Sequence, residues 1–187
     1  MTPDRINEEY RSYTLLAAYH QGKFKGRTWK DKALVHEIEG EGLEEILQRL
    51  RAEADRRINE QVAARTETPS VEEYTASLRK ILGTLSDRRL LMLKAHYEAP
   101  DRAVTAAQLS KLAGYASHGA ANLQYGLVGR ALFEELPCPL ATRADGSAIY
   151  TSAIATTPDT SAGPEEQWVW TMRPEVASAM VALGLHK

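Results

Sequence analysis

Side chains that can read the edges of base pairs gather in one short segment of the chain. Asn and Gln amides can donate to and accept from adenine at once, while Ser and His can donate or accept singly. The candidates for such contacts are Ser117, His118, Asn122, Gln124 and Tyr125. Basic side chains that could hold phosphate groups lie around them, namely Lys111, Arg130, Arg102 and Arg143. Together these residue types favour contact with double-stranded DNA.

The pattern around these residues predicts two helices joined by a tight turn. The first helix begins at Thr105, and Gly114 is placed to end it because glycine accepts the left-handed conformation without strain. Ser117 is a good N-cap for a second helix that runs to about Leu136. This is a helix-turn-helix pattern, whose second helix usually enters the DNA major groove. The alternative is that the same helices contact a protein.

The second helix has an expected inner face of leucines, and its glycines need a separate explanation. Leu123, Leu127 and Leu132 recur at helical spacing and predict the buried side. Gly126 and Gly129 lower the helix propensity. They indicate a close approach of this helix to another backbone or to a ligand.

The rest of the second half predicts a β-hairpin and a last helix. Residues 147–154 and 167–172 read as the two strands, with a long loop over residues 156–164 between them. Pro174 at the first helical position and Gly184 just past the end define the helix. Helices followed by a hairpin make a winged helix, so residues 67–187 are expected to form one domain.

The first 66 residues are expected to form a smaller domain for dimerisation or partner binding. Residues 9–39 read as three short strands, and a helix with apolar residues at spacings of three and four starts near Gly40. The polar residues 64–70 read as a linker. The expected fold class is therefore α+β: a three-stranded antiparallel sheet with one helix, followed by a winged helix-turn-helix.

One strand of this first domain carries a row of cations. Lys23, Lys25 and Arg27 fall on one face at a period of two residues, and Trp29 continues that face. A basic ribbon can follow a phosphate backbone. We favour the alternative, in which the charges are solvated and protect a sheet edge from pairing.

Composition and motifs give little support for catalysis. The net charge of −2 lacks the basic excess of many DNA-binding proteins, although a local basic face is compatible with it. Cys138 is the single cysteine, so a zinc site built on paired cysteines is excluded, and the five histidines are scattered. The sequence contains neither a phosphate-binding Gly-x-x-x-x-Gly-Lys-Ser/Thr loop nor a Gly-x-Ser-x-Gly elbow. We expect no enzymatic activity, no cofactor and no metal.

The sequence also predicts the setting of the chain. No apolar run approaches the length needed to span a membrane, and the first residues lack a signal-peptide core. A single thiol fits a reducing compartment. We therefore expect a cytoplasmic protein that does not enter membranes.

The second half of the chain resembles a winged-helix module that accompanies bacterial HNH-type restriction endonucleases. The matching motifs are Ala113-Gly114-Tyr115, the run Gly119-Ala-Ala-Asn-Leu-Gln-Tyr-Gly126, and the ending Trp170-Thr-Met-Arg-Pro-Glu175. The resemblance covers about half of the chain and implies a DNA-reading module. The histidine–asparagine–histidine cluster of the nuclease is missing, so the resemblance implies a DNA-reading module without the nuclease.

The first domain is similar, in the order of its elements, to antitoxin domains with a partial ribonuclease-H fold. Val35-His-Glu-Ile-Glu-Gly-Glu-Gly-Leu-Glu-Glu-Ile-Leu47 resembles their third strand and the entry to their helix. Such units often dimerise or bind a partner protein. Their combination with a helix-turn-helix resembles an autoregulating repressor.

These observations lead to two hypotheses of different class. The first is a non-catalytic, homodimeric DNA-binding protein that acts as a regulator, or as an accessory reader in a defence or counter-defence system. Dimerisation is expected because paired half-sites double the contacts. The alternative is a phage or bacterial protein-interaction module that inhibits a nuclease or CRISPR-type complex.

Overall fold

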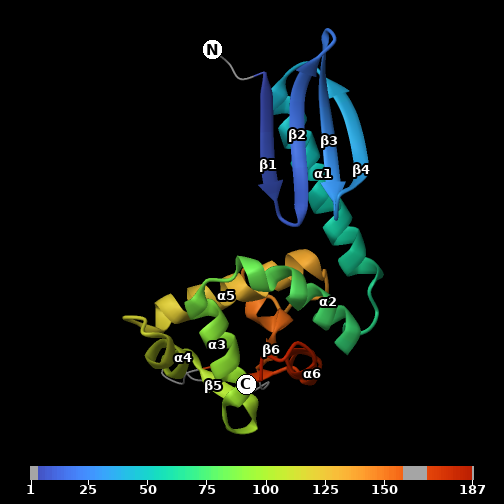
Figure 1. The fold of residues 1–187 in the computed structure, drawn as a ribbon. Coiled ribbons are helices and arrows are strands. Elements are labelled where there is room, and N and C mark those ends of the chain that lie inside the picture. Colours follow the sequence, from blue (N-terminus) through green and yellow to red (C-terminus); the bar gives the residue numbers. More distant parts are fainter. Residues whose placement is uncertain (1–3, 158–167, 187) are drawn as a thin grey trace. The chain divides into compact units, whose positions relative to one another are not determined.

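The N-terminal strands are short alternating runs separated by two-residue loops. In the computed structural model they form one antiparallel sheet in chain order (Figure 1). The strands are β1 (Arg5–Tyr10), β2 (Tyr13–His20), β3 (Lys23–Lys30) and β4 (Ala33–Gly40). The sheet therefore has four strands, and the expectation of three was wrong. The three predicted strands correspond to β2, β3 and β4, and β1 was missed. Arg11 adopts a left-handed φ of 54°, so the chain reverses between Tyr10 and Tyr13 and β1 pairs with β2.

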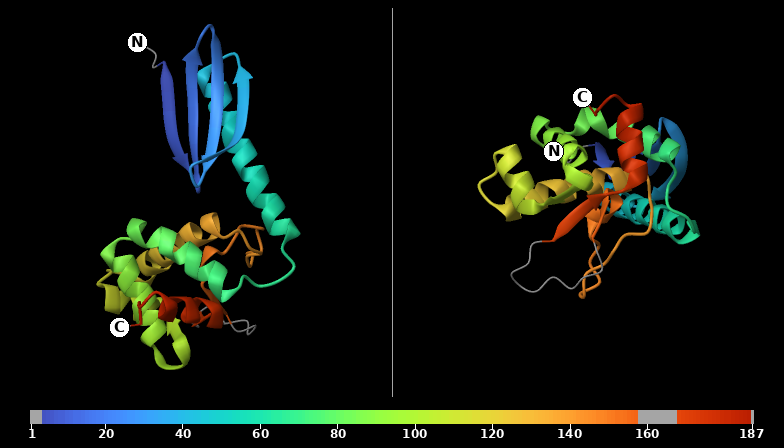
Figure 2. Two further views of the ribbon diagram at one scale, coloured as in Figure 1. Left: turned by 45° about the vertical axis from the view of Figure 1, so that its right-hand side comes forward. Right: turned by 90° about the horizontal axis from the view of Figure 1, so that it is seen from below.

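Helix α1 (Leu43–Ala64) covers one face of this sheet (Figures 1 and 2). Its buried residues, Leu43, Ile46, Leu47, Leu50, Ala54 and Ile58, are those that the helical spacing predicted. They meet Tyr13, Leu15 and Ala17, which alternate along β2 and are also buried. The helix lies so close to β3 that a Cβ atom at Gly26 would be 2.3 Å from Ile46. The first unit thus has a core of its own.

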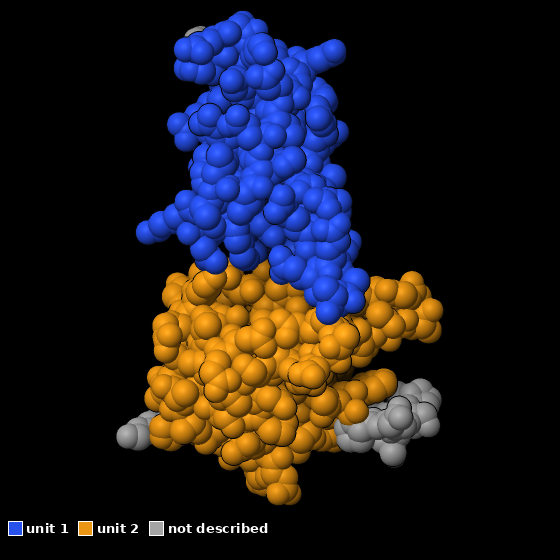
Figure 3. All heavy atoms as spheres, turned by 90° about the vertical axis from the view of Figure 1, so that its right-hand side faces the viewer, with its two compact units in different colours: residues 1–64 blue, residues 65–187 orange. Residues whose placement is uncertain are grey.

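The structure describes residues 4–157 and 168–186. The chain divides into two compact units, residues 1–64 and 65–187 (Figure 3). The division follows the end of α1 and falls at the polar segment before the next helix. The expected loop over residues 156–164 lies largely outside the described residues. Among those that are described, no helix combines the length and the apolar character that crossing a membrane requires.

The second unit consists of helices with a small sheet. Its sheet is antiparallel with the order β5-β7-β6, so the last strand lies in the centre. Its elements are α2 (Val71–Ile81), η1 (Leu82–Thr84), α3 (Asp87–Glu98), η2 (Pro100–Arg102), β5 (Ala103–Thr105), α4 (Ala106–Ala113), α5 (His118–Glu135), η3 (Tyr150–Ala153), β6 (Ala155–Thr156), β7 (Val169–Met172) and α6 (Pro174–Ala182). The last helix begins at Pro174 as expected, and Gly184 follows it with a left-handed φ of 71°.

The predicted strand over residues 147–154 is wrong. Tyr150–Ala153 forms the short 3-10 helix η3, and only Ala155–Thr156 pairs with β7. This segment is turned inward by its tertiary contacts. The buried Tyr74 hydroxyl donates to the carbonyl of Ala153 at 3.0 Å, and α5 touches the backbone of Tyr150 at Gly129. These partners override the β propensity of the segment.

Candidate nucleic-acid interface

The turn between α4 and α5 is fixed by its own hydrogen bonds. Gly114 adopts the left-handed conformation, with φ 67° and ψ 35°. The backbone N–H of Tyr115 donates to the carbonyl of Ser110 at 2.9 Å, and the Ser110 hydroxyl donates to the carbonyl of Tyr115 at 3.0 Å. The Ser117 hydroxyl accepts from the backbone N–H of Ala120 at 3.2 Å, which caps α5. The start of α5 is therefore held rigidly against the end of α4.

The side-chain amides of Asn122 and Gln124, both on α5, differ in exposure and in hydrogen bonding. Asn122 is exposed on the first turns of the helix, and His118 is exposed one turn before it. Gln124 is half-buried, and its Oε1 atom accepts from Nε of Arg89 at 2.9 Å. This bond orients the Gln124 side chain and leaves its NH2 group as the outward donor. Bidentate pairing with adenine needs a donor and an acceptor together, so Asn122 is the better candidate for it.

Tyr125 does not contact DNA, because its side chain is fully buried. The inner face of α5 consists of Ala121, Tyr125, Val128 and Leu132. Leu123 was expected inside and is 63% exposed, while Leu127 is half-buried. The predicted inner face was therefore rotated about the helix axis from the real one.

A buried histidine explains why the tyrosine points inward. Nδ1 of His96 lies 2.5 Å from the Tyr125 hydroxyl, and its Nε2 lies 2.9 Å from the carbonyl oxygen of Trp170. A carbonyl can only accept, so Nε2 donates and Nδ1 accepts from the hydroxyl. Burial lowers the pKa of His96 and favours this neutral form. The bonds join α3, α5 and β7 beneath the exposed start of α5.

Basic side chains from two other helices surround that start. Lys111 is exposed near the end of α4. The Arg88 guanidinium of α3 lies 5.5 Å from the ring centre of Tyr115 in the turn. Sequence reasoning missed Arg88 and Arg89, because they precede the helix-turn-helix pattern and come together with it only in the fold. One sequence signal could have indicated this surface: residues 106–124, which form α4, the turn and the start of α5, contain Lys111 but no Asp or Glu.

The other expected phosphate contacts lie apart from this cluster. Arg130 is twelve residues after His118, which is about 18 Å along the helix, and it pairs with Glu134 at 2.8 Å. Arg143 donates to the Ser147 hydroxyl and to the carbonyl of Ala148. Arg102 follows α3 at the end far from Arg88, and its guanidinium carbon lies over the Tyr97 ring. The structure thus brings together Ser117, His118, Asn122, Gln124 and Lys111 from the predicted set.

The row of cations on β3 is paired with carboxylates of β4. Nζ of Lys23 and Nζ of Lys25 lie 2.8 Å and 3.5 Å from Glu39, and Nε of Arg27 lies 2.5 Å from Glu37. The hydrogen bond and the charge of Lys23, with smaller contributions from Lys25, lower the pKa of Glu39. These surface pairs leave the strand with little net positive charge to offer a phosphate backbone.

Potential ligands for a metal are dispersed in the part of the chain that the structure describes, where no three His, Cys, Asp or Glu side chains group around a common point. Cys138 is buried, and burial raises the pKa of its thiol. Comparisons of the chain with protein-family models, curated proteins and solved structures found no match. The functional argument therefore rests on the geometry of the α4–α5 cluster.

Proposed function

We propose that the chain is a non-catalytic, double-stranded DNA-binding protein whose second unit is a winged helix-turn-helix. The order α3, β5, α4, α5, β6, β7 supports this fold, since two helices joined by a tight turn are followed by a short antiparallel pair. In this proposal α5 is the recognition helix and β6 with β7 forms the base of the wing. The second unit then reads DNA, and the first serves dimerisation or partner binding.

The observation that carries the proposal is the composition of the exposed start of α5. Asn122 and His118 are accessible there, with Lys111 and Arg88 on the neighbouring helices. An exposed amide with cations on the neighbouring helices suits a base edge flanked by phosphates. Asn122 and His118 lie at the N-terminal end of α5, and the positive end of a helix dipole favours an anion.

The cations have separable roles in this proposal. Lys111 and Arg88 contact phosphates, so they set affinity and salt dependence rather than sequence preference. Gly119 and Gly126 are both free of close neighbours that would limit a side chain, which leaves room for DNA to approach the α5 backbone. Two copies would place two recognition helices on paired half-sites. A regulator, or a reader in a defence or counter-defence system, would use this arrangement.

Selection from a random duplex library at two salt concentrations tests the proposal. We expect an enriched sequence whose affinity falls steeply with salt. Lys111→Ala and Arg88→Ala should each reduce the slope of log affinity against log salt by about 0.9, the contribution of one phosphate. Arg79→Ala, at an exposed arginine of α2 outside the cluster, is the matched control and should leave the slope unchanged. Two results would contradict the proposal. One is binding of the duplex library without enrichment of any sequence, and the other is the same salt slope in all three variants.

A second candidate function is favoured by exposed leucines on the same helices. Leu91, Leu112 and Leu123 lie on α3, α4 and α5, and the last two are 56% and 63% exposed. Apolar side chains of this size support docking of a protein partner, as expected of an inhibitor of a nuclease or CRISPR-type complex. Stoichiometric co-purification of one protein from a bacterial lysate, lost in Leu123→Ser and insensitive to DNase, would favour it. Binding of the chain to DNA, with no protein partner recovered, would exclude this second function.

A further inference from the structure

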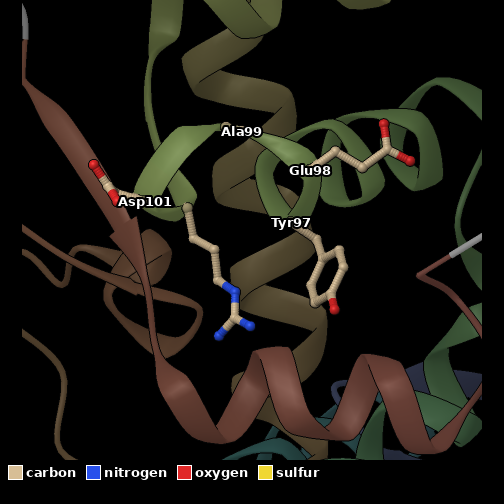
Figure 4. Close-up of a pocket in the computed structure, with 5 residues that line it drawn as sticks. Tyr97, Glu98, Ala99 and Asp101 are labelled. Atoms are coloured by element: carbon tan, nitrogen blue, oxygen red, sulfur yellow. The ribbon is translucent and has the colours of Figure 1, made fainter.

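Arg102 stands apart from the α4–α5 cluster and forms part of a surface pocket. Tyr97, Glu98, Ala99, Asp101 and Arg102 line this pocket, where α3 ends and the chain turns into β5 (Figure 4). The guanidinium carbon of Arg102 lies 5.2 Å from the centre of the Tyr97 ring. The carboxylates of Glu98 and Asp101 point away from that ring in Figure 4. The pocket therefore has a cation against an aromatic wall.

The Arg102 guanidinium has no carboxylate partner within the described residues. Several arginines of the first unit, in contrast, pair with a carboxylate, as Arg51 does with Glu8 and Arg57 with Glu53. A guanidinium that lies over an aromatic ring still has N–H groups along its planar edge for other partners. That planar edge matches the two oxygens of a carboxylate or phosphate.

The backbone holds this side chain in a strained conformation. Asp101 and Arg102 are consecutive non-glycine residues with left-handed φ angles of 52° and 53°. The other non-glycine residues of this kind, Arg11, Gln21, Asp31 and Lys32, lie in the two-residue loops of the first sheet. Such loops favour positive φ, whereas the connection from α3 to β5 is not a hairpin. Strain of this type is concentrated at ligand sites and switches.

The strained turn is connected to α5 by buried hydrogen bonds. His96, next to Tyr97 in the chain, donates from Nε2 to the carbonyl of Trp170, and Trp170 pairs with Val104 of β5, two residues after Arg102. The other ring nitrogen of His96 accepts from the hydroxyl of Tyr125, which belongs to α5. A shift of the Arg102 backbone therefore changes the position of the group on which Tyr125 depends.

We propose that the Tyr97–Arg102 pocket binds a small molecule through a carboxylate or phosphate group, and that its occupation alters DNA binding by α5. Binding of the anion rests on the pocket alone. The effect on DNA rests on the proposed function, and each part has its own measurement. The ligand shifts the turn between two conformations because it binds one of them more tightly than the other.

The first measurement is a titration of the full chain with inorganic phosphate, followed by nuclear magnetic resonance at constant ionic strength. We expect saturable shifts at Arg102, Tyr97 and the Trp170 indole. Arg102→Gly suits the left-handed φ and removes the guanidinium, so it should abolish these shifts in a folded protein. Arg102→Lys should weaken binding about tenfold, because lysine lacks the planar fork. Arg79→Ala, at an exposed arginine of α2 with no assigned role, is the matched control and should bind like the unmodified chain.

Equal saturable shifts in Arg102→Gly, or linear shifts in every variant, would overturn the site. The same titration with acetate distinguishes the two oxyanions: saturation by acetate alone identifies a carboxylate ligand, and saturation by phosphate identifies a phosphate ligand. Either result supports the pocket as an oxyanion site.

The second measurement is the affinity for duplex DNA with and without saturating anion. We expect a change of about fivefold or more, absent in Arg102→Gly. If DNA instead displaces the anion, and Arg102→Gly reduces the salt slope of DNA binding, Arg102 contacts the DNA backbone and the small-molecule proposal is overturned. If the chain binds no duplex DNA, the effect on DNA falls with the proposed function, while the titration still decides the pocket.

Discussion

Gly126 and Gly129 are one helical turn apart in α5 and have opposite surroundings. A Cβ atom at Gly129 would lie 2.1 Å from the carbonyl oxygen of Tyr150, whereas nothing lies within 4 Å of one at Gly126. The sequence predicted a close approach of another backbone or of a ligand at these glycines, and Gly129 has a backbone neighbour. Gly126 has none among the described residues, so its surface there is open to a ligand.

Alanine substitutions at these two glycines should therefore change the free energy of unfolding in opposite directions. Gly129→Ala forces the α5 and η3 backbones apart and should lower the free energy of unfolding by about 1–3 kcal/mol. Gly126→Ala adds helix propensity in open space and should raise it by up to about 1 kcal/mol. Urea unfolding of both variants measures this. Equal effects of the two changes would show that the contact with Tyr150 is not formed.

The orientation of α5 shows why some site residues could be predicted and others could not. Helical spacing identified Leu132 as buried but favoured Leu123 over Tyr125. A tyrosine is a poor core residue unless its hydroxyl finds a partner. That partner is His96, 29 residues earlier, and nothing in the local sequence indicates it. Exposed amides at the helix start, such as Asn122, follow from the local pattern and were predicted.

At the scale of elements, His96 holds α3, α5 and β7 together and makes the second unit sensitive to acid. Burial lowers the pKa of His96 from its ordinary value of 6.5, so below that value the unfolded chain binds a proton that the folded chain excludes. The contribution of neutral His96 to the free energy of unfolding should be fully present above pH 6.5. It should fall as the pH is lowered from there toward the pKa of His96 in the folded chain.

Urea unfolding between pH 7.5 and 5 measures this dependence. His96→Gln keeps a donor and an acceptor but has no proton to gain, so its stability should vary less across the same range. Equal pH dependence of the variant and the unmodified chain would mean that other groups cause the loss.

Elements with strong local signals were predicted, and those made by long-range contacts were not. Helix α1 and the α4–α5 turn follow from apolar spacing, Gly114 and Ser117. The loop at Arg11 was missed because it lacks the glycine or asparagine that usually marks a hairpin. Strand β5 is only three residues long and exists through its pairing with β7. The 3-10 helix η3 depends on Tyr74 and Gly129, which lie in other helices.

At the scale of the molecule, charge is distributed unevenly although the total is −2. Cations of the first unit are largely paired, as Arg51 is with Glu8 and Arg27 with Glu37. In the second unit, residues 102–133 carry cations alone. A near-neutral total is therefore compatible with a local surface that attracts phosphates, which composition alone did not indicate.

The two units should fold separately, because each buries a core of its own. A fragment of residues 65–187 should unfold cooperatively by circular dichroism and bind DNA with the salt slope of one full-length protomer. If residues 1–64 provide dimerisation, the fragment should lose the part of the affinity that comes from a second half-site. A fragment that remains unfolded would contradict the independence of the units.

The central claim is that the exposed start of α5 reads base edges, and Asn122 tests it most directly. Fluorescence anisotropy with the selected duplex and with a scrambled duplex should show that Asn122→Ala loses about 1–3 kcal/mol on the selected sequence and almost nothing on the scrambled one. Asn59→Ala, an exposed helical asparagine of the first unit, is the control and should leave both affinities unchanged. Equal affinities of Asn122→Ala and the unmodified chain for the selected duplex would contradict the account.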